Sequence, residues 1–485
     1  MRQKVNENIK ESGRIISYFS GIAKVQGLPH VFLHEILLDN DDREVGIVIG
    51  FDEHVTEVLI FEESFDYAVP VYRSRRLFSI PVSEACLGRV VDGFGRTIDG
   101  MGDLQGDQRA VFNEAPSVIQ REPVSMPLTT GIKIIDAALP LGRGQRELII
   151  GDRGLGKSAI ALNTVLNQKY ADPPVYCIYV LCGERREKLQ EIVALFKKEN
   201  ALLYTTIVAA TASDSFAAQY LAPFIGCTLG EHFRDAGKDA IIIYDDLSKH
   251  AKTYRDISLL LERAPGREAY PGDIFSLHAT LLERSAKLSE KKGGGSLSAL
   301  PIVETQEGDI TSFIPTNLIS ITDGQIYLER GLYQRGFLPA VNVGLSVSRV
   351  GSQAQSKSLA EVTGGIRLIL SQYKELQKLI QMETAVSEEA QSKIRRGTLL
   401  IELLKQEKYE YIGWEEQVIL FYSIEEGFFD DIIQADWHQF EKLLLEMIRN
   451  RYPNILERLK TNSFDKELKD AVKEIIIDFK HEFLS

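Results

Sequence analysis

The stretch IIGDRGLGKSAIAL, Ile149 to Leu162, decides the fold. It begins as an apolar strand, passes through a glycine-rich turn and continues with the spacing of a helix. Residues 151–158, GDRGLGKS, match the pattern G-x-x-x-x-G-K-[ST] in the strand–loop–helix context that this pattern requires. Glycines let backbone N–H groups turn toward phosphate oxygens, and the helix N-terminus adds partial positive charge. The stretch therefore predicts a phosphate loop that binds a nucleoside triphosphate.

The loop supplies most of the candidate ligands. We expect Lys157 to reach the outer phosphates and Ser158 to bind Mg²⁺, with ATP or ADP as the nucleotide. The candidate nucleotide-binding residues of the loop are Gly151, Asp152, Arg153, Gly154, Leu155, Gly156, Lys157 and Ser158. The pattern leaves open whether this protein hydrolyses its nucleotide or holds it while another subunit performs the chemistry.

Carboxylates follow two other apolar strands. DAIIIYDDLSKH ends a strand at Asp245, which we expect to hold a water of the Mg²⁺ shell, whereas Asp246 is the better candidate for a helix cap. YVLCGERRE ends another strand at Glu184. A carboxylate there can polarise an attacking water, as a general base does in hydrolysis. The alternative is a surface glutamate beside Arg185 and Arg186, and the sequence leaves both open.

Length and composition limit the class of protein. A chain of 485 residues exceeds the size of one hydrophobic core, so two or three domains are expected. The net charge of −13 argues against nucleic-acid binding. No apolar run reaches the roughly 18 residues of a membrane span, and the polar start MRQKVNENIKES lacks a signal-peptide core. Four cysteines without a CxxC pair fit a reducing compartment.

The patterning predicts a multi-domain α/β protein with boundaries at 1–79, 80–350 and 351–485. Short β-rich runs (GRIISYF, GIAKVQGL, EVGIVIGF, HVTEVLIF) predict an N-terminal β-barrel. Strands then alternate with helices, which predicts a central parallel sheet covered by helices. Its continuous apolar runs are RELIIG, VYCIYVL, LYTTIVAA, DAIIIYDD and TNLISIT. Beyond Gly351 apolar residues recur at helical spacing, which predicts a C-terminal helical bundle.

GLSVSRVGSQ places Arg349 just past a strand and before the helical part. A guanidinium offered across a subunit interface can neutralise charge that develops on a transferred phosphoryl group. The alternative is an ordinary salt-bridge residue.

Long contiguous blocks of the sequence resemble those of a known protein family. The sequence resembles the alpha subunit of F-type ATP synthases along almost its whole length. The blocks are LGRGQRELIIGDR (141–153), YDDLSKHAKTYRDISLLLERAPGREAYPGDIFSLHATLLERSAKL (244–288), LPIVETQEGDITSFIPTNLISITDGQIYLERGLY (300–333) and PAVNVGLSVSRVGSQAQ (339–355).

The resemblance implies a head of three alpha and three beta subunits around a gamma shaft. Peripheral-stalk subunits and an ion-conducting membrane rotor for H⁺ or Na⁺ complete the machine. Alpha would bind Mg-ATP at a non-catalytic site and offer Arg349 to the catalytic site of beta. Ser346 and Ser320 would lie near that catalytic site, and Tyr333 and Gln406 near the adenine. The head would sit on the cytoplasmic face of a bacterial inner membrane, touching it only through the rotor.

Several positions depart from the family pattern. Gly154-Leu155 and Ser158 replace a central Gln-Thr and a final Thr, and the hydroxyl for Mg²⁺ is retained. Glu184 stands where alpha subunits carry Gln, and the catalytic beta subunit uses Glu there. We expect this site to remain non-hydrolytic because beta subunits offer no arginine to it.

Other departures concern the base pocket and the docking segments. Leu338 and Lys408 stand at positions that the family fills with Arg and Gln. LIQMETAVSEEA (379–390) lacks the acidic pattern of the shaft-facing segment, and little sequence precedes Glu11 to bind the peripheral stalk. The shaft-facing segment and the short N-terminus together favour an alternate-operon ATPase of the Na⁺ type.

Two competing functions stay open. A self-sufficient homohexameric secretion-type ATPase would use both Glu184 and Arg349 of each subunit. An RNA-translocating hexamer would bind RNA strongly and in a salt-sensitive way, which the acidic composition disfavours.

Overall fold

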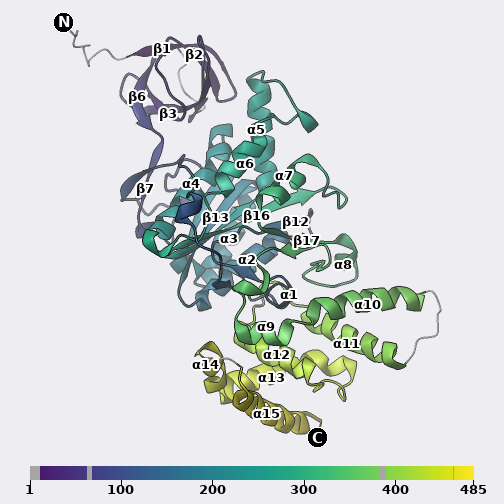
Figure 1. Ribbon diagram of the computed structural model, residues 1–485. Helices are drawn as coiled ribbons and strands as arrows, with labels where there is room; N and C mark the ends of the chain where they lie inside the picture. The colour runs from purple at the N-terminus through teal and green to yellow at the C-terminus, as the bar shows by residue number, and fades with distance from the viewer. Residues whose placement is uncertain (1–10, 63–67, 382–387, 462–463, 485) are drawn as a thin grey trace. The chain divides into compact units, whose positions relative to one another are not determined.

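The computed structural model describes residues 11–62, 68–381, 388–461 and 464–484 (Figure 1). The protein folds into two compact units. The first comprises Met1–Arg121, Tyr176–Val303 and Thr311–Ile321, and the second comprises Glu122–Val175, Glu304–Ile310 and Thr322–Ser485. The predicted segment before Glu11, and residues 382–387 of the predicted shaft-facing segment, lie outside the described residues. The predicted boundaries of the three domains stay a prediction.

A closed barrel of antiparallel strands opens the first unit, in the order β1-β2-β5-β4-β3-β6. The strands are β1 (Ser12–Phe19), β2 (Ile22–Gln26), β3 (Glu35–Leu38), β4 (Glu44–Phe51), β5 (Thr56–Ile60) and β6 (Val71–Leu77). Alternate residues such as Val25, Leu37 and Val58 point inward and fill the barrel. The predicted barrel is therefore confirmed.

The four predicted runs correspond to β1, β2, β4 and β5, and β3 and β6 were missed. The sequence of β6, VYRSRRL, is rich in charge and therefore lacks the apolar pattern that predicts a strand. Arg73 of β6 pairs with the fully buried Glu35 of β3 at 2.9 Å, so a polar pair helps to close the barrel. The alternation of apolar and polar residues cannot predict a strand pair that is joined by buried charges.

Parallel strands follow in the order β16-β15-β13-β14-β8, and β7 (Ser79–Val82) pairs separately with β9 (Asp107–Ala110). The parallel strands are β8 (Val90–Asp92), β13 (Val175–Glu184), β14 (Thr205–Thr211), β15 (Asp239–Asp245) and β16 (Ser296–Thr305). The helices are α3 (Arg186–Lys198), α4 (Phe216–Asp235), α5 (Leu247–Leu260), α6 (Ile274–Leu282) and α7 (Phe313–Ile321). All seven residues of β15 are buried, as a continuous apolar run predicts.

One predicted strand is wrong. TNLISIT was expected to be a buried strand, but most of it lies in helix α7. Ile314, Leu318 and Ile321 are buried and recur at spacings of four and three, which is the period of a helix. The run is apolar enough for either structure, and its true period appears only when the preceding residues are included.

The second unit holds the remaining strands and the C-terminal helices. β12 (Leu148–Asp152) pairs parallel with β17 (Gly324–Leu328), and β17 pairs antiparallel with β18 (Val347–Ser348). Two short strands, β10 (Pro127–Leu128) and β11 (Leu141–Gly142), form a separate ribbon. The helices are α1 (Lys133–Ala138), α2 (Lys157–Asn167), α8 (Arg330–Gln334), α9 (Lys357–Thr363), α10 (Ile366–Gln381), α11 (Glu388–Leu404), α12 (Trp414–Glu425), α13 (Trp437–Arg451), α14 (Pro453–Thr461) and α15 (Lys466–Leu484).

The predicted helical C-terminal part is confirmed, since the described residues beyond β18 form helices and no strand (Figure 1). Throughout the described ranges, none of the helices combines the length and the apolar character that crossing a membrane requires.

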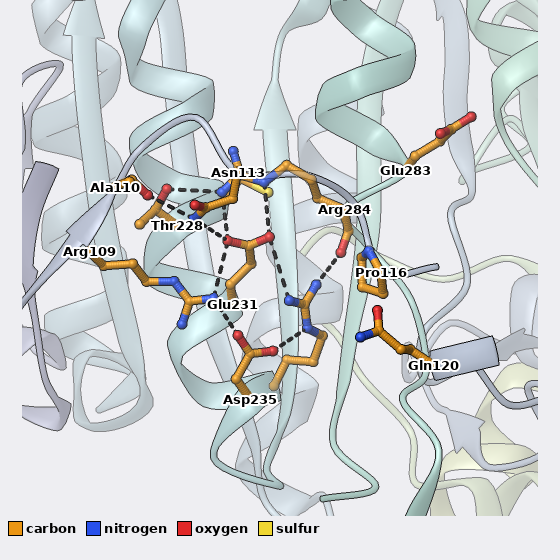
Figure 2. A network of polar contacts seen from close by, with 12 residues as sticks. Arg109, Ala110, Asn113, Pro116, Gln120, Thr228, Glu231, Asp235, Glu283 and Arg284 are labelled. Carbon is orange, nitrogen blue, oxygen red and sulfur yellow. Dashed lines mark hydrogen bonds and ion pairs between the residues drawn. The ribbon is translucent and has the colours of Figure 1, made fainter. Parts of the chain in front are cut away.

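A buried polar network fixes α4 in the first unit, and Figure 2 shows Glu231 at its centre. The guanidinium of Arg284 donates to both carboxylate oxygens of Glu231, at 2.9 and 2.6 Å, and to the hydroxyl of Thr228 at 3.0 Å. Arg284 also donates to the carbonyl of Val111 at 2.8 Å. Because α4 packs against β14 and β15, this network supports the strand that ends at Asp245.

We predict that Arg284→Met lowers the thermal midpoint of the protein by several degrees. The substitution leaves the buried Glu231 carboxylate without its main partner, which costs about 3–5 kcal/mol. Differential scanning calorimetry measures the change. The double variant Arg284→Met/Glu231→Met is expected to recover part of the loss. Arg458→Met, which removes an exposed pair with Glu467, is the matched control and should have little effect.

Candidate functional site

The phosphate loop lies in the second unit, between the end of β12 and the start of α2. Gly156 has φ of +98° immediately before the helix, a conformation that favours glycine. At Gly151, an added Cβ would lie 2.8 Å from the carbonyl oxygen of Leu328, so only glycine permits this close approach to β17. The strand–loop–helix arrangement predicted from the sequence is therefore present, with both glycines required by the backbone.

Lys157 begins α2 and its side chain is buried against the loop. Its ammonium donates to the backbone carbonyls of Gly151 and Asp152, both at 2.8 Å, and lies 3.9 Å from the carboxylate of Glu304. Ser158 follows in the first turn of the helix. A lysine and a hydroxyl at this place suit a phosphate and a hard cation respectively.

Asp152 ties the loop to neighbouring segments, a role that the sequence motif alone does not indicate. Its Oδ1 accepts hydrogen bonds from the hydroxyl of Thr305 at 2.7 Å and the backbone N–H of Gly308 at 2.8 Å. Its Oδ2 pairs with Arg330 at 3.1 Å. Burial raises the pKa of Asp152, but these hydrogen bonds and the charges of Arg330 and Lys157 lower the pKa by more. The carboxylate is therefore held ionised.

In the first unit, the ends of β13 and β15 bring three carboxylates together. Oxygens of Glu184, Asp245 and Asp246 lie within 4.8 Å of one another. Asp246 caps α5, because its side chain accepts from the backbone N–H of Lys249 at 2.8 Å. Asp245 is buried at the strand end and Glu184 is only 16% exposed, so Glu184 is not the surface glutamate that the alternative required.

Two lysines contact this cluster, and neither was predicted from the sequence. Lys188 donates to Asp245 at 2.8 Å and to Glu184 at 3.2 Å, and Lys249 pairs with Glu184. Burial lowers the pKa of Lys188, but the charges and hydrogen bonds of Asp245 and Glu184 outweigh it and raise the pKa above its usual value. In the sequence, the contact between Lys188 and Glu184 is indicated only by their spacing of four residues.

The carboxylates fit the predicted metal in chemical type, since Mg²⁺ prefers oxygen ligands. Among the residues that the structure describes, however, their oxygens already contact ammonium groups. Tyr179 also donates its hydroxyl to Asp245 at 2.7 Å. A divalent ion near Asp245 therefore meets carboxylates that are largely neutralised.

The segment that bears Arg349 is fastened on both sides in the second unit. The hydroxyl of Ser346 donates to the carbonyl of Asn342 at 2.7 Å and accepts from the backbone N–H of Tyr327 at 2.9 Å. The hydroxyl of Ser348 donates to the carbonyl of Pro140 at 2.9 Å. The backbone N–H of Arg349 donates to the carbonyl of Asp323 at 2.9 Å.

Against this fixed backbone, the side chain of Arg349 is exposed. Within the described ranges, its guanidinium forms no close ion pair with a carboxylate. The nearby carboxylate of Asp323 is taken by Arg146 at 2.7 Å. The charge of Arg349 acts on the buried carboxylate of Glu147, where it opposes the rise in pKa that burial causes. Both interpretations of Arg349 therefore stay predictions.

The remaining predicted residues are Tyr333, Ser320 and Gln406. Tyr333 is exposed on α8, and Ser320 is exposed on α7 of the first unit, where its hydroxyl donates to the carbonyl of Asn317 at 2.7 Å. Gln406 is buried, donates to the carbonyl of Gly131 at 2.7 Å and accepts from the backbone N–H of Lys133 at 2.9 Å. These bonds give Gln406 a structural role, and its adenine contact stays a prediction.

A small barrel, parallel strands with a phosphate loop and a helical C-terminal part define a nucleotide-binding protein of the P-loop class. The family model described as ATP synthase alpha/beta family, nucleotide-binding domain, matches residues 131–348. A second model, for the C-terminal domain of the ATP synthase alpha/beta family, matches residues 355–479.

Full-length relatives narrow this class. The ATP synthase subunit alpha of Aquifex aeolicus (strain VF5) is 46% identical over 493 residues, covering 100% of this sequence and 97% of that protein. The ATP synthase subunit alpha of Caldanaerobacter subterraneus subsp. tengcongensis is 46% identical over 478 residues, covering 98% and 94%. The chain therefore belongs to the family of ATP synthase alpha subunits, which confirms the resemblance and the predicted fold class. This family implies assembly with beta and other subunits.

We predict that Thr305→Val weakens nucleotide binding several-fold and lowers the thermal midpoint. Valine keeps the shape of threonine but removes one donor from the buried Asp152 carboxylate, which costs about 1–3 kcal/mol. Isothermal titration with ATP and calorimetry measure the two effects. Thr461→Val, at an exposed threonine on α14, is the control. Equal affinity and stability in both variants would contradict the anchoring role of Asp152.

Proposed function

We propose that this subunit holds Mg-ATP or Mg-ADP without hydrolysing it and supplies Arg349 to the catalytic site of an adjacent beta subunit. The observation that carries the proposal is the contrast between the exposed side chain of Arg349 and its fixed backbone. Ser346 and Ser348 hold that backbone through buried and partly buried hydrogen bonds. A cation held in this way loses little freedom when it meets developing negative charge, which is what stabilisation of a phosphoryl-transfer transition state requires.

The nucleotide of this subunit itself would be held by the phosphate loop. Lys157 would leave its backbone carbonyl partners for the outer phosphates, and the backbone N–H groups of the loop would receive phosphate oxygens. Ser158 would hold Mg²⁺, with Asp245 as the predicted partner of a water in its shell. Bound Mg²⁺ would neutralise phosphate charge.

Glu184 does not make this site a catalyst on our proposal. Its carboxylate contacts Lys188 and Lys249, so it is poorly placed to accept a proton from water. A site without an arginine from its neighbour also forgoes a rate factor of roughly 10³–10⁵. We therefore propose that turnover occurs in beta and that this subunit provides binding and charge.

Within the complete machine, this function couples ATP synthesis or hydrolysis to transport of H⁺ or Na⁺. We propose the partners predicted from the resemblance: a ring of alternating alpha and beta subunits, the gamma shaft and the peripheral stalk. The subunit would reach the cytoplasmic face of a bacterial inner membrane through those partners, and the alternate Na⁺-type machine is the favoured form.

We predict that Arg349→Ala lowers hydrolysis by the assembly with beta and gamma by about 10³-fold or more, since an arginine finger supplies a factor of this size. The measurement is steady-state phosphate release by the purified assembly. Arg451→Ala, at another exposed arginine, should retain wild-type activity. An assembly that keeps its activity with Arg349→Ala would refute the role of Arg349.

We predict that Lys157→Ala weakens ATP binding to the isolated full-length subunit by at least tenfold, because the loop loses its charged donor to phosphate. Equilibrium dialysis measures the affinity, and Lys169→Ala, at an exposed lysine beyond α2, is the control. Hydrolysis by the assembly should suffer far less than with Arg349→Ala. This difference separates the binding role of Lys157 from the transition-state role of Arg349.

The same experiments test the alternative of a self-sufficient homohexameric secretion-type ATPase. That alternative requires the purified subunit to form a hexamer and to hydrolyse ATP cooperatively without a beta subunit. Our proposal requires the lone subunit to bind ATP and release no phosphate at a comparable rate.

A further inference from the structure

A buried glutamate lies beside the short strand that leads to Arg349, and its contacts all belong to the second unit. Glu147, immediately before β12, is 1% exposed. Its Oε2 accepts a hydrogen bond from the side-chain amide of Gln145 at 2.8 Å, and the same nitrogen donates to the hydroxyl of Ser348 at 3.1 Å. The amide of Gln145 thus links the carboxyl group of Glu147 to the residue that precedes Arg349.

The orientation of the Gln145 amide is fixed by its oxygen. This oxygen accepts a hydrogen bond from the backbone N–H of Gly142 at 2.8 Å, so the amino group faces Glu147 and Ser348. The other carboxyl oxygen of Glu147, Oε1, is buried and has no hydrogen-bond partner among the residues that the structure describes. Burial without a partner costs more free energy for a charged group than for a neutral one, so this environment favours the neutral form of Glu147.

The pairing of β17 with β18 leaves room for this carboxyl group. Gly324 pairs with Ser348, and an added Cβ at position 324 would lie 2.5 Å from Oε2 and 2.9 Å from Oε1 of Glu147. It would also meet the carbonyl oxygen of Val347. Glycine at position 324 therefore allows Glu147 to lie against the strand pair that leads to Arg349.

The charge of Arg349 acts on this carboxyl group. Burial raises the pKa of Glu147 well above its ordinary value, and the charge of Asp323 adds to the rise. The hydrogen bond from Gln145 and the charge of Arg349 lower the pKa. Arg146, the residue before Glu147, pairs with Asp323 at 2.7 Å. Arg349 is therefore the cation that favours the ionised form of Glu147.

We propose that Glu147 is a positioning residue for Arg349: its ionised carboxylate draws the guanidinium toward the strand pair, and its neutral form releases the guanidinium to the phosphates of the adjacent beta subunit. The proposal rests on the proposed function of Arg349. Because coupling between two binding events is reciprocal, a phosphate that engages Arg349 also favours the uptake of a proton from solvent by Glu147. The carboxylate then gains an O–H bond and loses its charge.

The physical reason is competition between two anions for one cation. A charge in a buried environment acts on its neighbours more strongly than the same charge in water. The backbone of Arg349 is fixed and its side chain is exposed, so the guanidinium can be reached both by the field of Glu147 and by an anion outside the subunit. A neutral Glu147 no longer competes, and Arg349 then binds a phosphate more tightly.

The first experiment measures the ionisation of Glu147 in the full-length subunit without partners. Infrared difference spectroscopy follows the carbonyl stretch of the protonated carboxyl group over a series of pH values, and the band is assigned by its loss in Glu147→Gln. In Arg349→Met the midpoint of this titration should move to higher pH, equivalent to an about threefold or greater fall in the acid dissociation constant. Arg335→Met, at another exposed arginine of the second unit, is the matched control. Equal midpoints in the wild type and Arg349→Met would overturn the proposal.

A thermal measurement covers the case in which Glu147→Gln does not fold. At acidic pH Glu147 is neutral, so Arg349→Met should have the thermal midpoint of the wild type. As the pH rises through the folded-state pKa, the carboxyl group ionises and the stability that its raised pKa contributes is lost. The charge of Arg349 offsets part of that loss, so Arg349→Met should be less stable than the wild type only on the alkaline side. A difference between the two proteins that is the same at every pH would contradict the proposal.

The assembly with beta and gamma tests the role of Glu147 in turnover. Glu147→Gln, whose amide stays neutral, should have a higher kcat than the wild type, and the ratio of the two should increase several-fold as the pH rises. The KM for ATP should not change. In an Arg349→Ala background the same substitution should leave the ratio independent of pH, whereas a purely structural role of Glu147 would affect both backgrounds alike.

Failure of this proposal and failure of the proposed function give different results. If Arg349→Ala abolishes hydrolysis while the ratio of Glu147→Gln to wild type stays constant with pH, the role of Glu147 is refuted and the proposed function stands. If Arg349→Ala leaves hydrolysis intact, the proposed function fails, and the role of Glu147 in turnover fails with it.

Discussion

The phosphate loop depends on one buried carboxylate. Asp152 ends β12, and its oxygens gather a hydroxyl from Thr305, an N–H from Gly308 and the guanidinium of Arg330. A glycine-rich loop has many accessible conformations, and a bound phosphate selects only those whose N–H groups turn inward. Fixing the residue before the loop removes part of that freedom in advance. Part of the rigidity of the site therefore comes from a carboxylate that is bound by three donors of the protein itself.

Much of the fold follows from local patterns. Continuous apolar runs predict the buried strands, such as DAIIIYDD, and apolar residues at helical spacing predict the helices after Gly351. The glycine-rich motif predicts the loop. The patterns failed where tertiary partners decide the outcome. Strand β6 is charged because Arg73 pairs with the buried Glu35, and TNLISIT belongs to a helix whose period begins before the quoted run. Neither partner nor period is visible in a short window.

For the candidate site too, local motifs could be predicted from the sequence and tertiary partners could not. Motifs identified Lys157 in the second unit. In the first unit they identified the carboxylates that follow β13 and β15, because backbone geometry places such residues at one edge of parallel strands. The partners of those residues were missed. Lys188 and Lys249 belong to helices that follow different strands, so only the folded first unit brings them to Glu184. Likewise, the structural hydrogen bonds of Gln406 to Gly131 and Lys133 join residues far apart in the sequence.

The identity of a residue at position 184 is therefore a poor guide to its chemistry. A glutamate can act as a general base only if its lone pairs and charge are available to water. Here two ammonium groups contact one oxygen of the Glu184 carboxylate, Oε1. The cation that could assist catalysis, Arg349, has a fixed backbone and an exposed side chain. In the first unit, two lysines thus offset part of the charge of three carboxylates. In the second unit, the side chain of Arg349 is exposed. That distribution suits a subunit that binds one nucleotide and acts on another.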